Sequence, residues 1–350
     1  MISITGNYPP DLNPFNIPGV WARWDSGYYL KIATDGYKVG GSEVNFFPLY
    51  PILSRLAALN NISLIPIAAF LVSNIAFCIA CLLLWNVLKQ DFGEEQATAS
   101  IIFLNVFPTA FFFSAIYSES VFLLFSVLVY WFSSRKQYIL AGVCVGIAAL
   151  GRINGLILCV IPIIEIILTR PSNWKVRILS VFVFSILGLG LYSLYLWLSQ
   201  GNPLAFISSQ QSLMKRSITL PGLSVLDSIR VVLYGSGGFE NNWFMRFLSI
   251  QDLVALGLFV ILTILSFRYI SRKSLVAFMV ASIIFLLMSH GPYTLGVYAM
   301  ARYVLVVFPG FVVIGFIFLS KPRLKWVVWI AFVLLSFAYT GWFVSGRWVA

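Results

Sequence analysis

Residues 62–88 read ISLIPIAAFLVSNIAFCIACLLLWNVL, and this uncharged, apolar run decides the fold. A helix needs about 20 such residues to cross the hydrocarbon core of a bilayer. Comparable runs recur up to the C-terminus, and the chain is 60% hydrophobic and only 10% charged, with a mean hydropathy of +0.92. A soluble domain would carry about 25% charged residues. The sequence therefore predicts an all-α, polytopic integral membrane protein.

The hydropathy pattern predicts about ten membrane spans. We expect them near residues 62–88, 98–116, 119–134, 138–151, 153–169, 178–199, 250–270, 274–290, 302–320 and 326–345. The stretch at 138–151 is short, which indicates a helix that is tilted, enclosed by other helices or partly re-entrant.

Basic residues in the short loops predict the orientation of the chain. One set of alternating loops carries 12 basic residues against three acidic ones, so the positive-inside rule makes that side cytoplasmic. The chain then divides into an outer segment with an interfacial helix (1–61), a first helix set (62–199), a large outer loop (200–249) and a second helix set (250–350). The basic residues are spread over loops, so nucleic-acid binding is not expected.

This orientation brings five polar residues from distant parts of the chain to the same outer face. They are Asp25, Glu119, Arg152, His290 and Arg302. Ionisable residues at membrane depth are costly, and they commonly mark functional sites. We take this convergence as the main sequence argument for a site.

Asp25 lies in the aromatic segment WARWDSGYYLKIA, residues 21–33. Trp21, Trp24, Tyr28 and Ile32 follow one face of a helix, which predicts an interfacial helix that ends at Gly36. Asp25 is then either a general base at the membrane boundary or a solvated carboxylate on that helix. The stretch at 45–51, with two prolines, is expected to turn the chain, either as a wall of the site or as a plain connector.

Glu119 occupies a very short outer turn after Tyr117 and Ser118. One role is that of a helix cap, with Ser118 as the N-cap residue and an acid in the first turn. The other role is in the site, paired with a cation or facing a wet cavity. The two roles are compatible.

Several cations could bind an anion at this face. Arg152, between two glycines in GRING, and Arg302, at the start of a span, are either snorkelling side chains or ligands of a phosphate. Lys215 and Arg216 are weaker candidates for the same role or simply solvated. His290 is the single histidine, so it forms no metal site by itself.

The four cysteines fall within apolar runs. Cys78 and Cys81 have CxxC spacing, but no second pair or neighbouring histidine completes a metal site. We interpret Cys78, Cys81, Cys144 and Cys159 as packing residues, and no metal-ligating residue is predicted.

These motifs together resemble the GPI mannosyltransferase II (PIG-V) family and its prokaryotic relatives. The similarity rests on Trp24–Tyr29 with Gly36-Tyr37, Phe46–Pro51, Tyr117–Ser120, Gly151–Leu156, Arg302-Tyr303 with Phe308-Pro309, and Gly346–Ala350. The resemblance implies a GT-C glycosyltransferase that takes a sugar, mannose in this family, from a polyprenyl- or dolichyl-phosphate donor. Such enzymes use an acidic residue of the first outer loop as catalytic base, which by motif position is Asp25.

The resemblance also sets the expected chemistry and location. We expect an inverting single displacement with Asp25 as base. Glu119 is the second catalytic candidate, which would orient the acceptor, position the neighbours of Asp25 or pair with an arginine. The donor phosphate is expected to be held by Arg152 and Arg302, with Lys215 and Arg216 as weaker candidates. Trp24, Tyr28, Tyr29, Tyr117, Ser118 and His290 are expected to line the substrate pocket. Many members need no metal, so no cofactor is expected, although a divalent metal stays open. The acceptor is a lipid or glycan, and the membrane is the plasma membrane of a prokaryote or the endoplasmic reticulum of a eukaryote.

Two alternatives remain at this stage. A multi-spanning transporter or a flippase of lipid-linked glycans would also have many spans and outer charges, although we find no internal repeat of the kind that transporters carry. A non-catalytic membrane scaffold would leave the clustered charges unexplained. The family usually has a helix before the Trp24-Asp25 segment, so we expect either an upstream helix that is absent from this chain or an N-terminal segment that crosses unaided.

Overall fold

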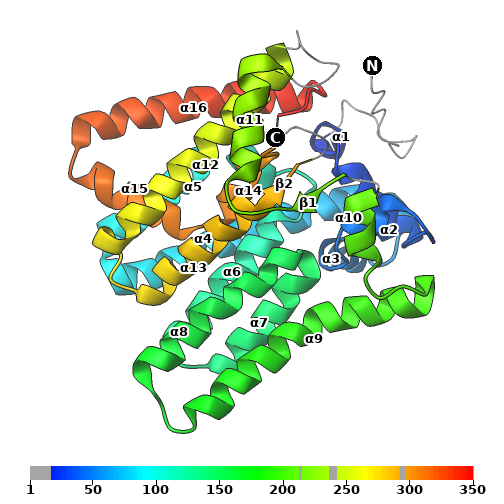
Figure 1. Ribbon diagram of the computed structural model, residues 1–350, viewed down its shortest axis with the longest axis horizontal. Coiled ribbons are helices and arrows are strands. Elements are labelled where there is room, and N and C mark those ends of the chain that lie inside the picture. The colour runs from blue at the N-terminus through cyan, green and yellow to red at the C-terminus, as the bar shows by residue number, and fades with distance from the viewer. Residues whose placement is uncertain (1–16, 213–214, 236–242, 292–295, 350) are drawn as a thin grey trace.

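A computed structural model describes residues 17–212, 215–235, 243–291 and 296–349, and 79% of the structure is helical (Figure 1). Parts of the expected outer segments 1–61 and 200–249, together with Ala350, lie outside these described residues. This all-α architecture confirms the fold class that the hydropathy predicted.

The helices follow one another along the chain with short connections. The α-helices are α1 (Ile17–Trp21), α2 (Ser26–Asp35), α3 (Leu49–Ala57), α4 (Ile65–Phe92), α5 (Glu94–Val106), α6 (Glu119–Ser134), α7 (Tyr138–Gly151), α8 (Val160–Thr169), α9 (Trp174–Gln200), α10 (Ala205–Ser212), α11 (Leu223–Tyr234), α12 (Trp243–Tyr269), α13 (Lys273–Met288), α14 (Met300–Tyr303), α15 (Pro309–Leu319) and α16 (Pro322–Val344). The 3-10 helices are η1 (Ser42–Asn45), η2 (Ile62–Leu64), η3 (Ala110–Phe113), η4 (Ile153–Cys159) and η5 (Val304–Val306). Strands β1 (Ser217–Ile218) and β2 (Ser289–His290) pair antiparallel.

Four helices of the described chain are long and apolar enough to cross a membrane. They are Ile62–Phe92, Trp174–Gln200, Trp243–Tyr269 and Arg323–Val344, and they coincide with four of the predicted spans. Four shorter apolar helices, Glu119–Ser134, Tyr138–Gly151, Ile153–Thr169 and Lys273–Met288, coincide with four more. The protein is therefore a multi-pass membrane protein. The helices of the described residues do not form ten full-length spans.

Two predicted spans are broken. The one expected at 98–116 ends as a helix at Val106, and the chain then bends through Pro108 into η3. The one expected at 302–320 is a pair of helices, Met300–Val306 and Pro309–Leu319, that meet at 86°. In both places a proline removes a backbone donor and fixes φ, which ends a helix that hydropathy alone reads as continuous.

The prediction of one continuous helix across Trp21 and Trp24 is also wrong. Residues between α1 and α2 leave the helix, and Trp24 has a left-handed φ of 54°, so α2 begins only at Ser26. Its end at Asp35, before Gly36 with φ 78°, is as predicted. The expected turn at 45–51 is shorter than predicted, because α3 starts at Leu49 and holds Pro51 in its first turn, where no backbone donor is needed.

The helices pack as a bundle around a central region that contains α14, β1 and β2 (Figure 1). On one side α4, α6, α7 and α9 pack in succession, and on the other α5 packs against α15, which also contacts α12. The helices α1–α3 and α10 lie beside the centre (Figure 1). The N-terminal segments and the short helix α14 therefore meet where the two halves of the bundle join.

Helices α7 and α9 approach very closely because glycines face each other. A Cβ atom on Gly188 would collide with the backbone of Gly146, and one on Gly142 would lie 2.9 Å from the Cα atom of Val181. This contact holds the end of α7, and hence Arg152 directly after it, against the rest of the bundle.

Candidate active site

Asp25 is held by its backbone at the start of α2. Its N–H donates to the hydroxyl of Tyr117 at 3.3 Å, and that hydroxyl donates to the carbonyl oxygen of Arg23 at 3.1 Å. Tyr117 is fully buried. The segment from residue 23 to 25 is thus fixed against Tyr117, just before the start of α6, although Asp25 lies 92 residues before Tyr117 in sequence.

The Asp25 carboxylate belongs to a chain of four alternating charges. Oδ2 of Asp25 lies 2.7 Å from Nη1 of Arg302, and Nε of Arg302 lies 2.8 Å from Oε1 of Glu119. Nη2 of Arg152 lies 3.0 Å from that same Glu119 oxygen. The structure therefore brings together the two predicted catalytic acids and the two arginines, from residues up to 277 positions apart.

Burial is deepest in the middle of this chain of charges, and the side chain of Arg152 at its other end is 12% exposed. The side chain of Asp25 is 21% exposed, whereas those of Arg302 and Glu119 are 5% and 0% exposed. A buried carboxylate is tolerated only when cations compensate it, and Glu119 has two. Arg302 also lies over aromatic rings, with its Cζ atom 5.1 Å from the ring centre of Tyr117.

The contacts of Glu119 are ionic rather than aligned hydrogen bonds. Within the described chain, neither its two carboxylate oxygens nor Nη1 of Arg152 has a hydrogen-bonding partner of good geometry. Of the two acids in this cluster, Asp25 is the one that is partly open to solvent, so it is the acid that can reach a substrate.

A cavity of about 310 Å³ opens beside Asp25. Its charged lining residues are Asp25, Arg152, Arg216 and Arg302, which makes the lining cationic. Arg216 donates from Nη1 to the hydroxyl of Tyr303 at 2.7 Å, and Tyr303 also lines the cavity. Such a lining favours an anion, and arginine is well suited to phosphate.

A second group of residues lines the cavity with amide and aromatic side chains. Asn45, Phe46, Phe47, Asn154, Phe206, Gln210 and Gln211 belong to it. The stretch at 45–47 therefore is a wall of the cavity, one of the two roles predicted for it. Amides and aromatic rings of this kind can contact a polar ring such as a sugar.

Tyr29 closes the cavity near Asp25 and is fixed by Ser118. The Tyr29 hydroxyl lies 2.9 Å from Oγ of Ser118. Burial raises the pKa of Tyr29 above its usual value, so the side chain is a neutral phenol. Ser118 precedes α6 as expected, but its side chain makes no capping hydrogen bond.

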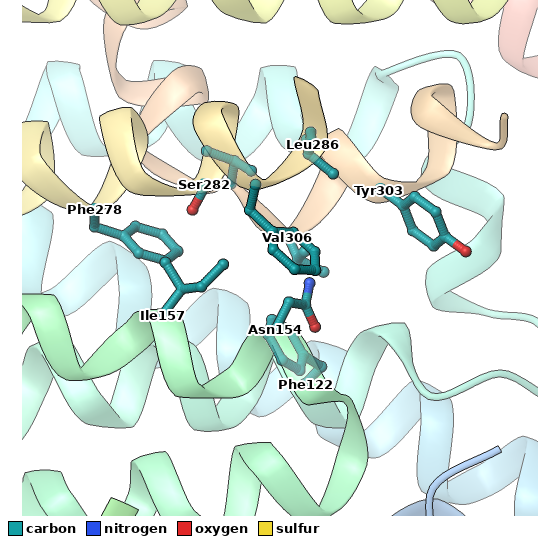
Figure 2. A pocket seen from close by; sticks show the side chains of 10 residues that line it. Phe122, Asn154, Ile157, Phe278, Ser282, Leu286, Tyr303 and Val306 are labelled. Atoms are coloured by element: carbon teal, nitrogen blue, oxygen red, sulfur yellow. The ribbon is translucent and has the colours of Figure 1, made fainter. Parts of the chain in front are cut away.

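A second, much smaller cavity of about 10 Å³ adjoins the first (Figure 2). The two share Asn154, Phe285, Leu286 and Tyr303. Figure 2 shows Asn154 reaching between Phe122 and Val306, and the hydroxyl of Tyr303 pointing away from this crevice. The crevice has room for about one water molecule, so it is no substrate site.

Several predicted site residues do not line the larger cavity. Tyr28 stacks on Phe46 at 4.3 Å between ring centres, and Trp24 contacts Trp348 edge-on at 5.3 Å. Tyr117 and Ser118 lie behind the lining and support it, and Lys215 is exposed. Of the six predicted pocket residues, Tyr29 alone is part of the lining.

His290 is part of the structural frame around the cavity. Its Nε2 atom lies 3.1 Å from Oδ2 of Asp227, and β2 pairs Ser217 with His290. That pairing fixes the segment directly after Arg216. The sequence identified the residue but not this role, because Asp227 is 63 positions away.

The arginines are not snorkelling side chains in this structure, since both are ion-paired with Glu119. Of the two glycines that flank Arg152 in GRING, Gly155 allows a close approach of the backbone: a Cβ there would lie 2.5 Å from the backbone of Ala148. The sequence reasoning missed Gln210, Gln211 and Phe206, which carry no local signal. It also missed Asp252, an acid within the apolar helix α12 that could have been noticed.

Of the predicted packing cysteines, Cys144 is buried, whereas Cys78 is exposed on the apolar surface of α4. All four cysteines are free thiols. In the part of the chain that the structure describes, no group of three or more His, Cys, Asp and Glu side chains could hold a metal ion.

These features define a multi-pass membrane protein with a buried ion cluster beside a cationic cavity. Comparison with known proteins then identifies its family: the chain belongs to the mannosyltransferase (PIG-V) family, whose model matches residues 17–197. That match contains Asp25, Glu119 and Arg152, and Arg302 lies beyond it.

Individual relatives agree with this family. The chain is 32% identical over 143 residues to GPI mannosyltransferase 2 of Schizosaccharomyces pombe, covering 40% of this chain and 31% of that protein. It is 28% identical over 128 residues to GPI mannosyltransferase 2 of Drosophila pseudoobscura pseudoobscura, covering 33% and 28%. The chain thus matches about a third of the length of these relatives.

The fold is shared with a solved membrane protein. ArnT from Cupriavidus metallidurans bound to undecaprenyl phosphate superposes with a TM-score of 0.56 at 12% identity, covering 89% of this chain and 60% of that one. The apo form of ArnT gives a TM-score of 0.54. This similarity confirms the GT-C-like helical fold.

Proposed function

We propose that this protein is a membrane mannosyltransferase that moves a sugar from a polyprenyl-phosphate donor to an acceptor hydroxyl. The observation that carries the proposal is the Asp25 carboxylate, partly exposed and paired with Arg302, at a cavity that Arg152 and Arg216 also line. A base beside a cluster of cations suits a reaction in which a hydroxyl loses a proton and a phosphate leaves.

In the proposed reaction the acceptor oxygen attacks the anomeric carbon of the sugar. Asp25 takes the hydroxyl proton as the new carbon–oxygen bond forms. The bond from the anomeric carbon to the phosphate oxygen breaks on the opposite face, and the polyprenyl phosphate leaves with that electron pair. The configuration at the anomeric carbon is therefore inverted.

The arginines stabilise the phosphate in this scheme. Arg216 is held by Tyr303, and Arg302 is held by Glu119, so the guanidinium groups are ordered before a donor arrives. Glu119 is fully buried and paired twice, which gives it the role of positioning Arg152 and Arg302 rather than of meeting a substrate. Lys215 is exposed and has no part in this proposal.

The donor class and the location are also proposals. ArnT, with the same fold, is described with undecaprenyl phosphate bound. The apolar lining residues Ile207, Ile218, Phe285 and Leu286 offer apolar contacts for a prenyl chain. We propose that the site faces the outer or luminal side, because its residues lie at the ends of the predicted spans opposite to the basic loops that the positive-inside rule makes cytoplasmic. The acceptor is a lipid or glycan hydroxyl.

The first prediction tests the base. Asp25→Asn should still insert and bind donor but lose sugar transfer by about 10²–10⁴-fold, because the amide cannot take the proton. Transfer is measured with purified protein, polyprenyl-phosphate mannose and a panel of lipid and glycan acceptors, with products identified by mass spectrometry.

Asp35→Asn is the matched control, since it makes the same chemical change at the other, exposed end of α2. It should transfer at the wild-type rate. Near-wild-type transfer by Asp25→Asn would show that Asp25 is not the catalytic base. A wild-type protein that moves the lipid across vesicles without forming product would instead support a flippase.

A further inference from the structure

Asp252 is a buried carboxylate that the proposed chemistry does not use. It lies on α12, it is 3% exposed, and it takes part in none of the ion pairs among the described residues. A carboxylate within an apolar helix is costly, so its partners indicate its purpose.

Both oxygens of Asp252 accept hydrogen bonds from the backbone around α14. Oδ2 accepts from the N–H of Ala299 at 2.8 Å, and Oδ1 accepts from the N–H of Ala301 at 3.0 Å. These are amides that the first turn of a helix leaves without partners. Asp252 therefore acts as a cap for α14 that is supplied by a different helix.

Helix α14 needs such support because it is very short. It has four residues, and it begins after Ala299, which has a left-handed φ of 60°. Isolated turns of helix are unstable, and a left-handed alanine costs about 1–2 kcal/mol. A second fixed point is Thr109, whose Oγ1 donates to the carbonyl oxygen of Ala301 at 2.6 Å. The peptide groups on both sides of Ala301 are thus held by side chains from other segments.

The residues that follow Ala301 are the ones that face the cavity. Arg302 pairs with Asp25 and Glu119, and Tyr303 accepts from Arg216. Any rotation or slip of α14 would therefore move Arg302 and Tyr303 together. Asp252 holds the backbone that precedes these two residues, and it is not itself among the residues that line the cavity.

We propose that Asp252 is a second positioning residue for Arg302, beside Glu119, and that it sets the phosphate-binding geometry of the site through the backbone of α14. This inference rests on the proposed glycosyl transfer. Asparagine at this position would keep one acceptor oxygen and turn an N–H donor toward a backbone N–H. One of the two hydrogen bonds would be lost, and α14 would be free to shift.

The test is a double-mutant cycle on the full-length protein in detergent or nanodiscs. Asp252→Asn should lower kcat/KM for polyprenyl-phosphate mannose by about 10- to 100-fold, as expected for loss of a buried charged hydrogen bond. In an Arg302→Lys background the same change should cost less than about 3-fold, because its effect passes through Arg302. Asp35→Asn is the control that should leave kcat/KM unchanged.

A merely structural role would give a different result. The cost of Asp252→Asn would then be the same in both backgrounds, and this outcome would overturn the proposal. If Asp252→Asn does not fold, Thr109→Val replaces it, since it removes the hydrogen bond on the other side of Ala301 and should show the same non-additivity on a smaller scale. Equal costs of Thr109→Val in both backgrounds would also overturn the proposal.

Failure of the proposed function is recognised separately. If the proposed function is wrong, the wild-type protein will form no glycosylated product. If only the present inference is wrong, the wild-type protein will be active, and Asp252→Asn will lower kcat/KM by the same factor with Arg302 and with Lys at that position. Affinity for undecaprenyl phosphate, measured by thermal shift, is followed in parallel. It should fall in Asp252→Asn and not in Asp35→Asn, and an unchanged affinity in Asp252→Asn would count against Asp252.

Discussion

At the scale of single residues, Glu119 is the acid on which the ion cluster depends. It is fully buried between Arg302 and Arg152, and it begins α6. Removing one partner of a buried ion pair leaves an uncompensated charge, which costs more than the pair itself contributes. Glu119 therefore links the stability of the fold to the order of the site.

We predict that Glu119→Gln lowers the free energy of unfolding by about 3–5 kcal/mol, because Arg152 loses its counter-charge and the buried Arg302 keeps only that of Asp25. Thermal unfolding in detergent measures the effect. Glu94→Gln is the matched control, since Glu94 also begins a helix and pairs with a cation, Lys89, but is 63% exposed. That exposed pair should contribute about 0–1 kcal/mol. Equal losses in the two variants would contradict this account.

At the scale of elements, apolar length predicted the long helices well but not where the chain breaks. Ile62–Phe92 and Trp174–Gln200 lie close to their predicted spans because their hydropathy is unambiguous. The break before Asp25 could not be predicted, since aromatic spacing suited a helix and the left-handed Trp24 packs against Trp348 from the far end of the chain. The sequence could place Asp25, Glu119, Arg152 and Arg302 on one face, but only the fold brings their atoms into contact.

The glycine contact between α7 and α9 gives an element-scale prediction. Gly188→Ala should lower the melting temperature, because the added Cβ collides with the backbone of Gly146. Overpacking of this kind costs about 1–3 kcal/mol, which exceeds the gain of about 1 kcal/mol in helix propensity. Gly190→Ala, on the same helix with open space around it, should leave the melting temperature unchanged or raise it. The measurement is thermal unfolding of the two variants under the same conditions. A higher melting temperature in Gly188→Ala than in the wild type would contradict the close contact between Gly188 and Gly146.

At the scale of the whole molecule, the two ends of the described chain meet beneath the site. Nη2 of Arg23 donates to the carbonyl oxygen of Val344 at 2.8 Å, and Trp21 lies near Phe343 with ring centres 6.3 Å apart. Trp348 contacts Trp24 edge-on and stacks on Tyr298 at 5.8 Å. The position of Asp25 therefore depends on residues more than 300 positions away.

We predict that Trp348→Ala lowers sugar transfer by about 10-fold, because Trp24 and Tyr298 each lose an aromatic contact of about 0.5–1.5 kcal/mol next to Asp25 and α14. Trp348→Phe should retain most of the transfer. Trp326→Ala, at a Trp that is 59% exposed on α16, is the control and should have no effect on transfer. The measurement is the rate of sugar transfer by the three purified variants. A wild-type rate in Trp348→Ala would show that the contacts of Trp348 with Trp24 and Tyr298 are dispensable.

The contact between Arg23 and Val344 has a consequence for biosynthesis. Synthesis runs from the N-terminus to the C-terminus, so Arg23 is made 321 residues before Val344, and the Trp21–Asp25 segment lacks this partner while the helices between them are made and inserted. Contacts between distant parts of a chain form late and slowly. The segment that carries Asp25 therefore gains this contact only after α16 has been made.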